Sequence, residues 1–221
     1  MAMASVQVFG CPTWPEVARV LACLFEKEVE FQLIRPNNYD GLKRMPSLKE
    51  KGPRFAFKDG KVTLQVTESR EICRHIAEKY VDQGTKDLLA VRGTHERCSI
   101  EQWLQTEVGS FDPPSSELVL NLGFGLPTGP DKEVIEQNKQ KLDEVLHIYD
   151  KRLQETKFLA GDKFTLADLS HLPNAQRLVS NDEYRSLIRT REKVSLWWDV
   201  ISRRKSWQRV MEMQQEPPSV K

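Results

Sequence analysis

The first 80 residues switch between the two hydrophobic periods of regular secondary structure. Val6 to Gly10 reads as a short strand that ends at a glycine. The apolar residues of Glu16 to Lys27 recur at helical spacing, and Val29 to Ile34 alternates as a second strand. A strand, a helix and a strand in this order predict a parallel strand pair joined by a crossover helix.

A hairpin and a second helix complete this half of the chain. Arg54 to Lys58 and Val62 to Val66 flank Asp59-Gly60, a dipeptide that is typical of tight hairpins. Glu68 to Tyr80 again has helical spacing. We therefore expect a βαβ unit followed by a ββα unit within one domain of residues 1–81.

The second half shows only helical patterns. Residues 82–92 open with the polar run Asp82 to Asp87 and predict a linker, and residues 93–221 predict an all-helical domain, so the fold class is α+β. Gly93 to Leu122 is a long helix candidate that Asp112-Pro113-Pro114 should interrupt, because proline removes a backbone donor and clashes with the preceding turn. Asp131 to Glu155 predicts a second long helix.

Local signals place a helix start and a loose tail near the C-terminus. Thr165 and Asp168 have the spacing of a capping box, in which two side chains satisfy backbone donors at a helix start. Residues 214–221 are polar and contain Pro217-Pro218, so we expect this segment to be loose.

Composition and charge exclude several classes of function. A formal net charge of +1 gives no electrostatic reason to bind nucleic acid or a membrane surface. No apolar run approaches the roughly 20 residues that cross a bilayer, and the N-terminus lacks a secretory signal. The four cysteines lie too far apart for zinc spacing or a disulfide framework. We expect a cytosolic protein without a bound metal.

Four segments resemble the glutathione S-transferase family, and its plant phi class in particular. They are VARVLACLFEK, TESREICRHIAEKY, FLAGDKFTLADLSHLP and WWDVISRRKSWQRV, the last of which resembles the flavonoid-carrier branch of that class. The resemblance covers residues 5–213. It implies a thioredoxin-like N-terminal domain, an all-helical C-terminal domain, glutathione as co-substrate, a hydrophobic small-molecule ligand and a homodimer.

The resemblance also implies where glutathione lies. Glu68 would pair with the α-ammonium group of the peptide, and Ser69 would receive its γ-glutamyl carboxylate at the start of a helix, where partial positive charge favours anions. Lys43 and Arg44 match the family's basic positions for the glycine carboxylate. From the residues alone, Ser69 could instead serve only as a helix cap, and the two basic residues could belong to a solvated loop.

The cysteinyl contact departs from the family pattern. A cis-proline normally precedes the third strand, and here Phe55 occupies that place, with Pro53 two residues earlier. Because cis bonds are costly outside proline, Phe55 is not expected to be cis. Pro53, Arg54 and Phe55 are the residues that we expect at this contact.

The catalytic position departs as well. The class carries a serine at the start of its first helix, whose hydroxyl favours the glutathione thiolate, and Trp14 occupies that place. Thr13 offers a hydroxyl one residue earlier. Cys11-Pro12 resembles the Cys-Pro sequence of the cysteine-type transferases, in which the thiol reacts directly. Thr13, Cys11 and Trp14 are therefore all candidates.

The second substrate should occupy an apolar pocket between the two domains. Its expected lining is Pro12, Trp14, Ile34, Phe111, Val119, Leu122 and Phe124. Three functions remain open on these residues. The protein could conjugate glutathione to a hydrophobic metabolite. It could carry flavonoid-type metabolites without catalysis, as a ligandin. The fold could also serve an isomerase, cyclase or lyase step in specialised metabolism.

Overall fold

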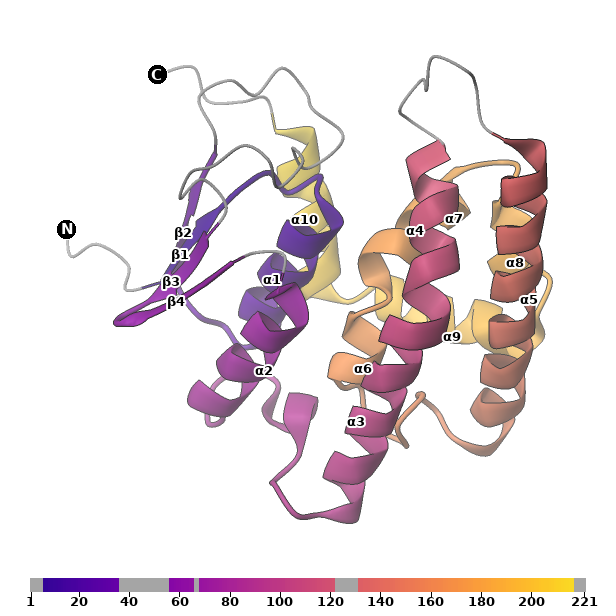
Figure 1. Ribbon diagram of the computed structural model, residues 1–221. Helices are drawn as coiled ribbons and strands as arrows, with labels where there is room; N and C mark the ends of the chain where they lie inside the picture. Colours follow the sequence, from indigo (N-terminus) through magenta and orange to yellow (C-terminus); the bar gives the residue numbers. More distant parts are fainter. Residues whose placement is uncertain (1–5, 36–55, 66–67, 122–130, 217–221) are drawn as a thin grey trace. The chain divides into compact units, whose positions relative to one another are not determined.

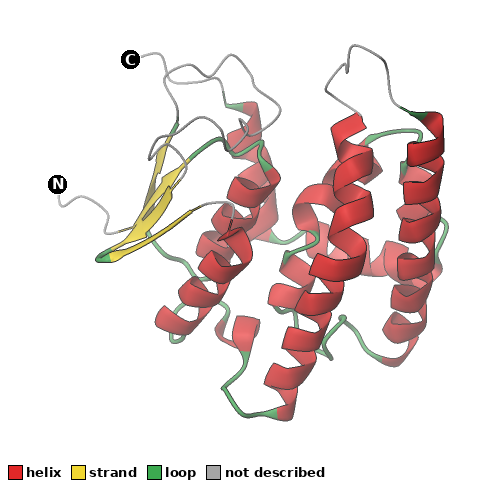
Figure 2. Ribbon diagram, viewed as in Figure 1, coloured by secondary structure: helices red, strands yellow, loops and turns green. Residues whose placement is uncertain are grey.

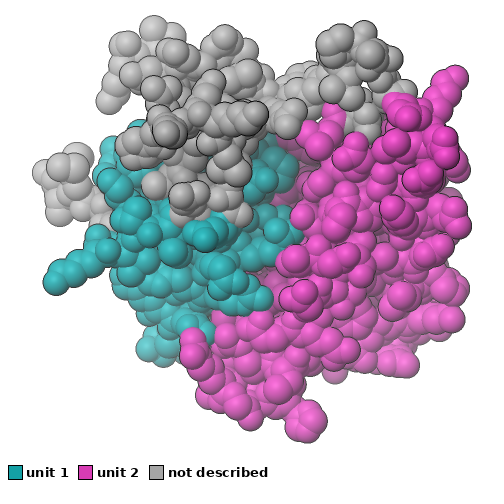
Figure 3. Space-filling model, in the orientation of Figure 1, with its two compact units in different colours: residues 1–86, 205–221 teal, residues 87–204 magenta. Residues whose placement is uncertain are grey.

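The computed structural model of this protein consists of two compact units (Figure 3). Unit 1 contains residues 1–86 and 205–221, and unit 2 contains residues 87–204. The structure describes residues 6–35, 56–65, 68–121 and 131–216.

Unit 1 contains a four-stranded sheet in the order β2-β1-β3-β4 (Figure 1). Its strands are β1 (Val6–Phe9), β2 (Phe31–Ile34), β3 (Ala56–Asp59) and β4 (Val62–Gln65). The β1–β2 pair is parallel, whereas β3 is antiparallel to both β1 and β4. This arrangement confirms the predicted βαβ-ββα order and the α+β fold class.

The predicted hairpin at Asp59-Gly60 is confirmed, with a turn one residue later than the dipeptide suggests. Asp59 pairs with Val62, so Gly60 and Lys61 form the two-residue loop. Gly60 has a φ of 61°, whereas Lys61 has no positive φ. This is the φ pattern of a type II′ turn, in which glycine takes the first central position.

Three described helices belong to unit 1, and in Figure 1 they lie on the same face of the sheet. They are α1 (Pro15–Glu26), α2 (Ser69–Lys79) and α10 (Lys205–Gln215). The first two match the helices that the sequence predicts. The third packs against α1 and so belongs to unit 1, although the sequence pattern had grouped all of residues 93–221 together.

A buried carboxylate ties the hairpin of unit 1 to α2. Asp59 is 1% exposed, and its side chain accepts hydrogen bonds from His75 at 3.0 Å, from the hydroxyl of Tyr80 at 3.0 Å and from Lys79. Burial alone would raise the pKa of Asp59, but these hydrogen bonds and the charge of Lys79 outweigh it and lower the pKa below its ordinary value. The folded protein therefore favours the ionised form of Asp59.

We expect this carboxylate to make unfolding dependent on pH. A lowered pKa in the folded state stabilises the fold fully above the unfolded value of about 3.9, and the contribution disappears as the pH falls through the folded value. Asp59→Asn should reduce the free energy of unfolding by about 2 kcal/mol at pH 7, because it weakens the hydrogen bonds from the three donors. The loss is no larger because these donors are partly exposed and regain water. Urea denaturation of both proteins at neutral and at strongly acidic pH checks this. An equal difference at both pH values would contradict it.

The described residues of unit 2 form helices joined by loops (Figure 2). Their bounds are α3 (His95–Thr106), α4 (Asp112–Asn121), α5 (Lys132–Glu155), α6 (Leu166–Leu169), α7 (Leu172–Ser180), α8 (Arg185–Arg189) and α9 (Glu192–Ser202). A short 3₁₀ helix, η2 (Lys86–Leu89), begins at the last residue of the first segment of unit 1 and lies within residues 82–92, which the sequence predicts to be a linker.

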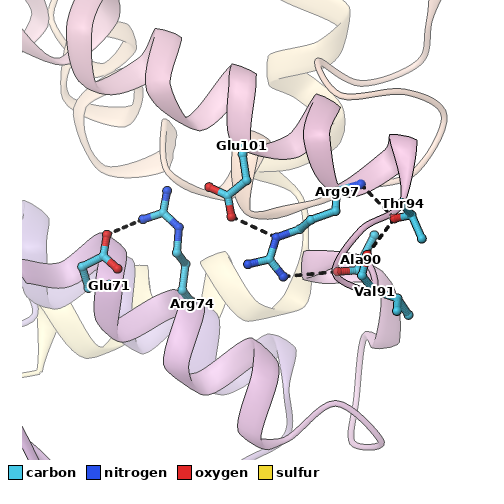
Figure 4. A network of polar contacts seen from close by, with 7 residues as sticks. All are labelled: Glu71, Arg74, Ala90, Val91, Thr94, Arg97 and Glu101. Carbon is cyan, nitrogen blue, oxygen red and sulfur yellow. Dashed lines mark hydrogen bonds and ion pairs between the residues drawn. The ribbon is translucent and has the colours of Figure 1, made fainter.

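The start of α3 shows how local sequence fixes a helix end (Figure 4). The side chain of Thr94 accepts a hydrogen bond from the backbone of Arg97 at 3.1 Å and donates one to the carbonyl of Val91 at 2.7 Å. Arg97 in turn binds Glu101 one turn later at 2.9 Å and the carbonyl of Ala90 at 3.3 Å. The cap and the ion pair together anchor the first two turns of α3.

The two adjacent prolines do not break the helical path at their own position. A π-helical segment, η3 (Glu107–Phe111), joins α3 to α4, and the backbone N–H of Asp112 donates to the carbonyl of Glu107, five residues earlier. Pro113 and Pro114 then fall in the first turn of α4, where backbone donors need no partner within the helix. The interruption thus precedes the prolines. Because they lie in the first turn of α4, the backbone N–H groups that they lack are not needed within that helix.

The predicted capping box at the start of α6 is confirmed, and it extends into a larger network. Asp168 is fully buried and accepts from the backbone of Thr165 at 3.0 Å and of Leu159 at 3.1 Å. The indole of Trp197 on α9 donates to the same carboxylate at 2.9 Å. Asp168 therefore links a loop, a helix start and a distant helix inside unit 2.

Candidate functional site

The turn between β1 and α1 carries all three catalytic candidates. The backbone N–H of Trp14 donates to the carbonyl of Cys11 at 3.0 Å, which closes the turn. Pro15 then begins α1, with Trp14 as its N-cap residue. Proline suits this place because its fixed φ is already helical and its missing donor is one that a helix start does not need. Thr13 therefore lies two residues before a rigid helix start.

Cys11 is unsuited to act as a thiolate in this arrangement. Its side chain is completely buried, and burial raises the pKa of the Cys11 thiol to about 12, although the charge of Arg35 acts in the opposite direction. With this raised pKa, Cys11 remains protonated near neutral pH, whereas the thiolate is the nucleophilic form. The geometry thus favours a packing role for Cys11.

Trp14 also faces the interior. It is 1% exposed, and a Cβ atom added to Gly10 would lie 3.2 Å from its ring. Its indole therefore packs close to the Gly10 backbone, and a larger residue at position 10 would push the ring aside. Thr13 is only half-buried, so it is the candidate of the three that retains accessible surface.

The start of α2 holds the two residues that the family pattern assigns to the γ-glutamyl end of glutathione. Glu68 is the N-cap residue of α2 and is exposed, whereas Ser69 is completely buried. The hydroxyl of Ser69 accepts a hydrogen bond from the buried guanidinium of Arg19 at 2.7 Å. The first turn of α2 is thereby tied to α1, and the exposed side chain of Glu68 lies directly before it.

The remaining predicted residues fall into three groups. Pro12 and Ile34 belong to unit 1: Pro12 lies in the turn before α1, and Ile34 is the last residue of β2. Phe111 and Val119 belong to unit 2 and are buried there, with the ring of Phe111 centred 4.5 Å from that of His171. The others lie outside the described residues: Lys43, Arg44, Pro53, Arg54, Phe55, Leu122 and Phe124.

Three polar residues near this site were not anticipated from the sequence. Arg19 interrupts the apolar stripe of α1, and a charge in that position is a signal that could have indicated a buried partner. Arg35 and Gln214 carry no such signal. The prediction that residues 214–221 are loose is wrong for Gln214 and Glu216, because α10 continues to Gln215 and both side chains are bonded.

A groove of about 650 Å³ opens on unit 1. It is lined by Phe25, Glu28, Val29, Glu30, Phe31, Leu33, Arg209, Met213 and Glu216. None of the predicted site residues lines it. In the described part of the chain, no three potential metal ligands gather into a group. No helix there has both the length and the apolar character to cross a membrane.

Comparison with known proteins places this geometry in a family. The family described as "Glutathione S-transferase, C-terminal domain" matches residues 111–205. Glutathione S-transferase F11 of Arabidopsis thaliana is 35% identical over 94% of this chain and 98% of its own length. The corresponding values for F10 of the same plant are 39%, 90% and 93%.

Solved structures agree with the sequence relatives. The crystal structure of poplar glutathione transferase F1 has a TM-score of 0.84 and 42% identity, covering 95% of this chain and 98% of the poplar chain. Glutathione transferase F2 from Populus trichocarpa has a TM-score of 0.83 and 41% identity, covering 95% and 99%. On this fold, these relatives and the four matching sequence segments, the chain belongs to the phi class of the glutathione S-transferase family.

Proposed function

We propose that this protein binds glutathione on unit 1 and conjugates it to a hydrophobic electrophile. Family membership supports the co-substrate. The observations that carry the proposal are an exposed carboxylate, Glu68, at the start of α2 and a half-buried hydroxyl-bearing residue, Thr13, before α1, both in unit 1. Glu68 suits the ammonium end of the peptide, and Thr13 suits the thiol.

The binding step uses opposite charges at the two ends of the peptide. Glu68 pairs with the α-ammonium group, while the positive end of α2 favours the adjacent carboxylate. Arg19 holds Ser69 at this helix start. Lys43 and Arg44 receive the glycine carboxylate, and Pro53, Arg54 and Phe55 flank the cysteine.

The chemical step is a substitution or addition at sulfur. The thiol loses its proton to solvent, and the hydroxyl of Thr13 donates a hydrogen bond that favours the resulting thiolate. The sulfur electron pair then forms a C–S bond to the electrophilic carbon. In a substitution the leaving group departs with its own electron pair. In an addition the π electron pair of the attacked bond is displaced onto the carbon framework, which then takes up a proton from solvent.

A carrier role is the second candidate, because one observation favours it. Trp14 stands in the place of the class serine and is buried, so the customary hydroxyl is absent from that position. In this case the protein holds a flavonoid-type metabolite without reaction. The resemblance of its C-terminal segment to the carrier branch points the same way. Under either function we propose a cytosolic homodimer, as in other members of the family.

Two matched pairs of variants test the transferase. Glu68→Gln should raise the dissociation constant for glutathione about tenfold in calorimetry, whereas Glu71→Gln on the same helix, where Arg74 holds Glu71, should not change it. Thr13→Val should lower kcat/KM with a chlorodinitrobenzene about ten- to hundredfold at unchanged glutathione affinity. Thr63→Val, on the exposed surface of β4, is its control.

The outcomes separate the candidates. Metabolite binding without turnover in the unmodified protein supports the carrier and contradicts the transferase. Loss of turnover in Cys11→Ala, with full activity in Thr13→Val, would move thiol activation to Cys11. Failure of the unmodified protein to bind glutathione would contradict the proposal altogether.

A further inference from the structure

The end of the chain returns to the turn that carries Thr13. The side-chain amide of Gln214, in the last turn of α10, donates a hydrogen bond to the carbonyl of Pro12 at 2.8 Å. Pro12 is buried and directly precedes Thr13. A contact across 202 positions of sequence thus reaches the peptide unit that joins Pro12 to Thr13.

The end of α10 is itself fixed by Arg35, which follows β2. One guanidinium nitrogen of Arg35 donates to the carbonyl of Met213 and to the carboxylate of Glu216, each at 3.2 Å. The other donates to the carbonyl of Glu216 at 3.3 Å. A cation at a helix C-terminus satisfies carbonyls that lack partners within the helix. We call Arg35, Met213, Gln214 and Glu216 the C-terminal clasp.

The clasp closes a loop of contacts around the turn. The backbone N–H of Gly10, just before the turn, donates to the carbonyl of Ile34 at 3.0 Å, and Ile34 is joined directly to Arg35. The turn is therefore held at its entry through β2 and at Pro12 through Gln214. Both supports meet at Arg35, which anchors the helix that carries Gln214.

The position of Thr13 depends on this loop of contacts. The Pro12 carbonyl belongs to the same planar peptide unit as the Thr13 nitrogen, so a bond that fixes one fixes the other. Hydrogen bonds to a reacting atom lose much of their effect when the donor shifts by about 1 Å. A support for Pro12 is accordingly a support for the Thr13 hydroxyl.

We infer that Gln214 is a positioning residue for the thiol-activating turn, acting through Pro12 on Thr13. This inference rests on the proposed function, in which Thr13 donates to the glutathione sulfur. It gives the end of α10 a part in the chemistry through its hydrogen bond to Pro12. It also assigns Arg35 the task of holding Gln214 in place.

The test compares Gln214→Met with Gln215→Met in the full chain. Methionine keeps the length of glutamine but cannot donate, and Gln215 is the exposed neighbour on the same helix. The thiolate absorbance of bound glutathione is followed against pH, together with kcat and the glutathione dissociation constant. Gln214→Met should raise the pKa of the bound thiol and lower kcat about fivefold or more at unchanged affinity. Gln215→Met should match the unmodified protein.

A second readout needs no ligand. Amide hydrogen exchange at Trp14, whose N–H closes the turn, should accelerate in Gln214→Met and in Arg35→Met but not in Gln215→Met. A purely structural contact would lower the melting temperature and leave the thiol pKa and kcat unchanged, which overturns the inference while the proposed function stands. If the unmodified protein neither binds glutathione nor promotes ionisation of the glutathione thiol, the proposed function fails, and the positioning role fails with it.

Discussion

Asp168→Ala is expected to destabilise the protein by about 3–5 kcal/mol. The substitution leaves the backbone donors of Thr165 and Leu159 and the indole of Trp197 without a partner, all in buried surroundings. A buried donor without an acceptor costs about 1–3 kcal/mol, because it has lost its water and gains nothing in exchange. Chemical denaturation in urea, monitored by tryptophan fluorescence, measures the loss directly.

Asp162→Ala provides the control. Asp162 lies six residues earlier, is exposed and accepts one hydrogen bond, from the backbone of Lys157 at 3.2 Å. Its loss should cost less than about 1 kcal/mol, since water replaces the exposed acceptor. Equal destabilisation by the two substitutions would show that the buried network around Asp168 contributes no more than an exposed contact.

Gly84→Ala is the second substitution with a large expected effect. Gly84 has a φ of 51°, and a Cβ atom there would lie 2.2 Å from the carbonyl oxygen of Glu26 and 2.8 Å from the backbone of Lys27. The same carbonyl accepts the N–H of Thr85 at 2.8 Å, so it cannot move without breaking that bond. Backbone strain and overpacking together should cost about 3 kcal/mol or more.

Gly60→Ala separates the two causes. Gly60 has a similar φ of 61°, but an added Cβ atom would meet nothing within 4 Å. It should cost about 1 kcal/mol, from backbone strain alone. The difference between the two melting temperatures isolates the close approach of Gly84 to α1. Equal stability of the two variants would contradict the claim that an added Cβ atom at position 84 clashes with Glu26.

Much of the fold follows from local sequence. The hairpin needed only Asp59 and Gly60 between alternating strands, and the start of α6 needed only the spacing of Thr165 and Asp168. In both places backbone geometry and side-chain chemistry within four residues decide the structure. These elements were accordingly predicted at the positions where the structure has them, within a residue or two.

The interruption predicted at Asp112-Pro113-Pro114 is found directly before these residues, as a π-helical segment that leaves the prolines in the first turn of α4. The clear error arises where a distant contact decides. Gln214 looked like part of a loose tail because its sequence is polar and close to prolines. Its partner, Pro12, lies at the other end of the chain, and no local pattern reveals such a contact.

The candidate site was predicted more in its residues than in its geometry. The resemblance to the family selected Glu68 and Ser69, and the structure places them at the start of α2. It could not show that Ser69 is turned inward toward Arg19. Nor could it rank Thr13 above Cys11, because that ranking depends on burial, and burial depends on the whole of unit 1.

Because unit 1 is assembled from both ends of the chain, the order of synthesis matters for its maturation. The ribosome makes α1 early and α10 last, and all of residues 87–204 emerge between them. At typical elongation rates that interval lasts roughly ten seconds. Until it ends, the side of α1 that α10 will cover has no permanent neighbour there. The ribosome therefore completes the synthesis of residues 87–204 before unit 1 can reach its native structure.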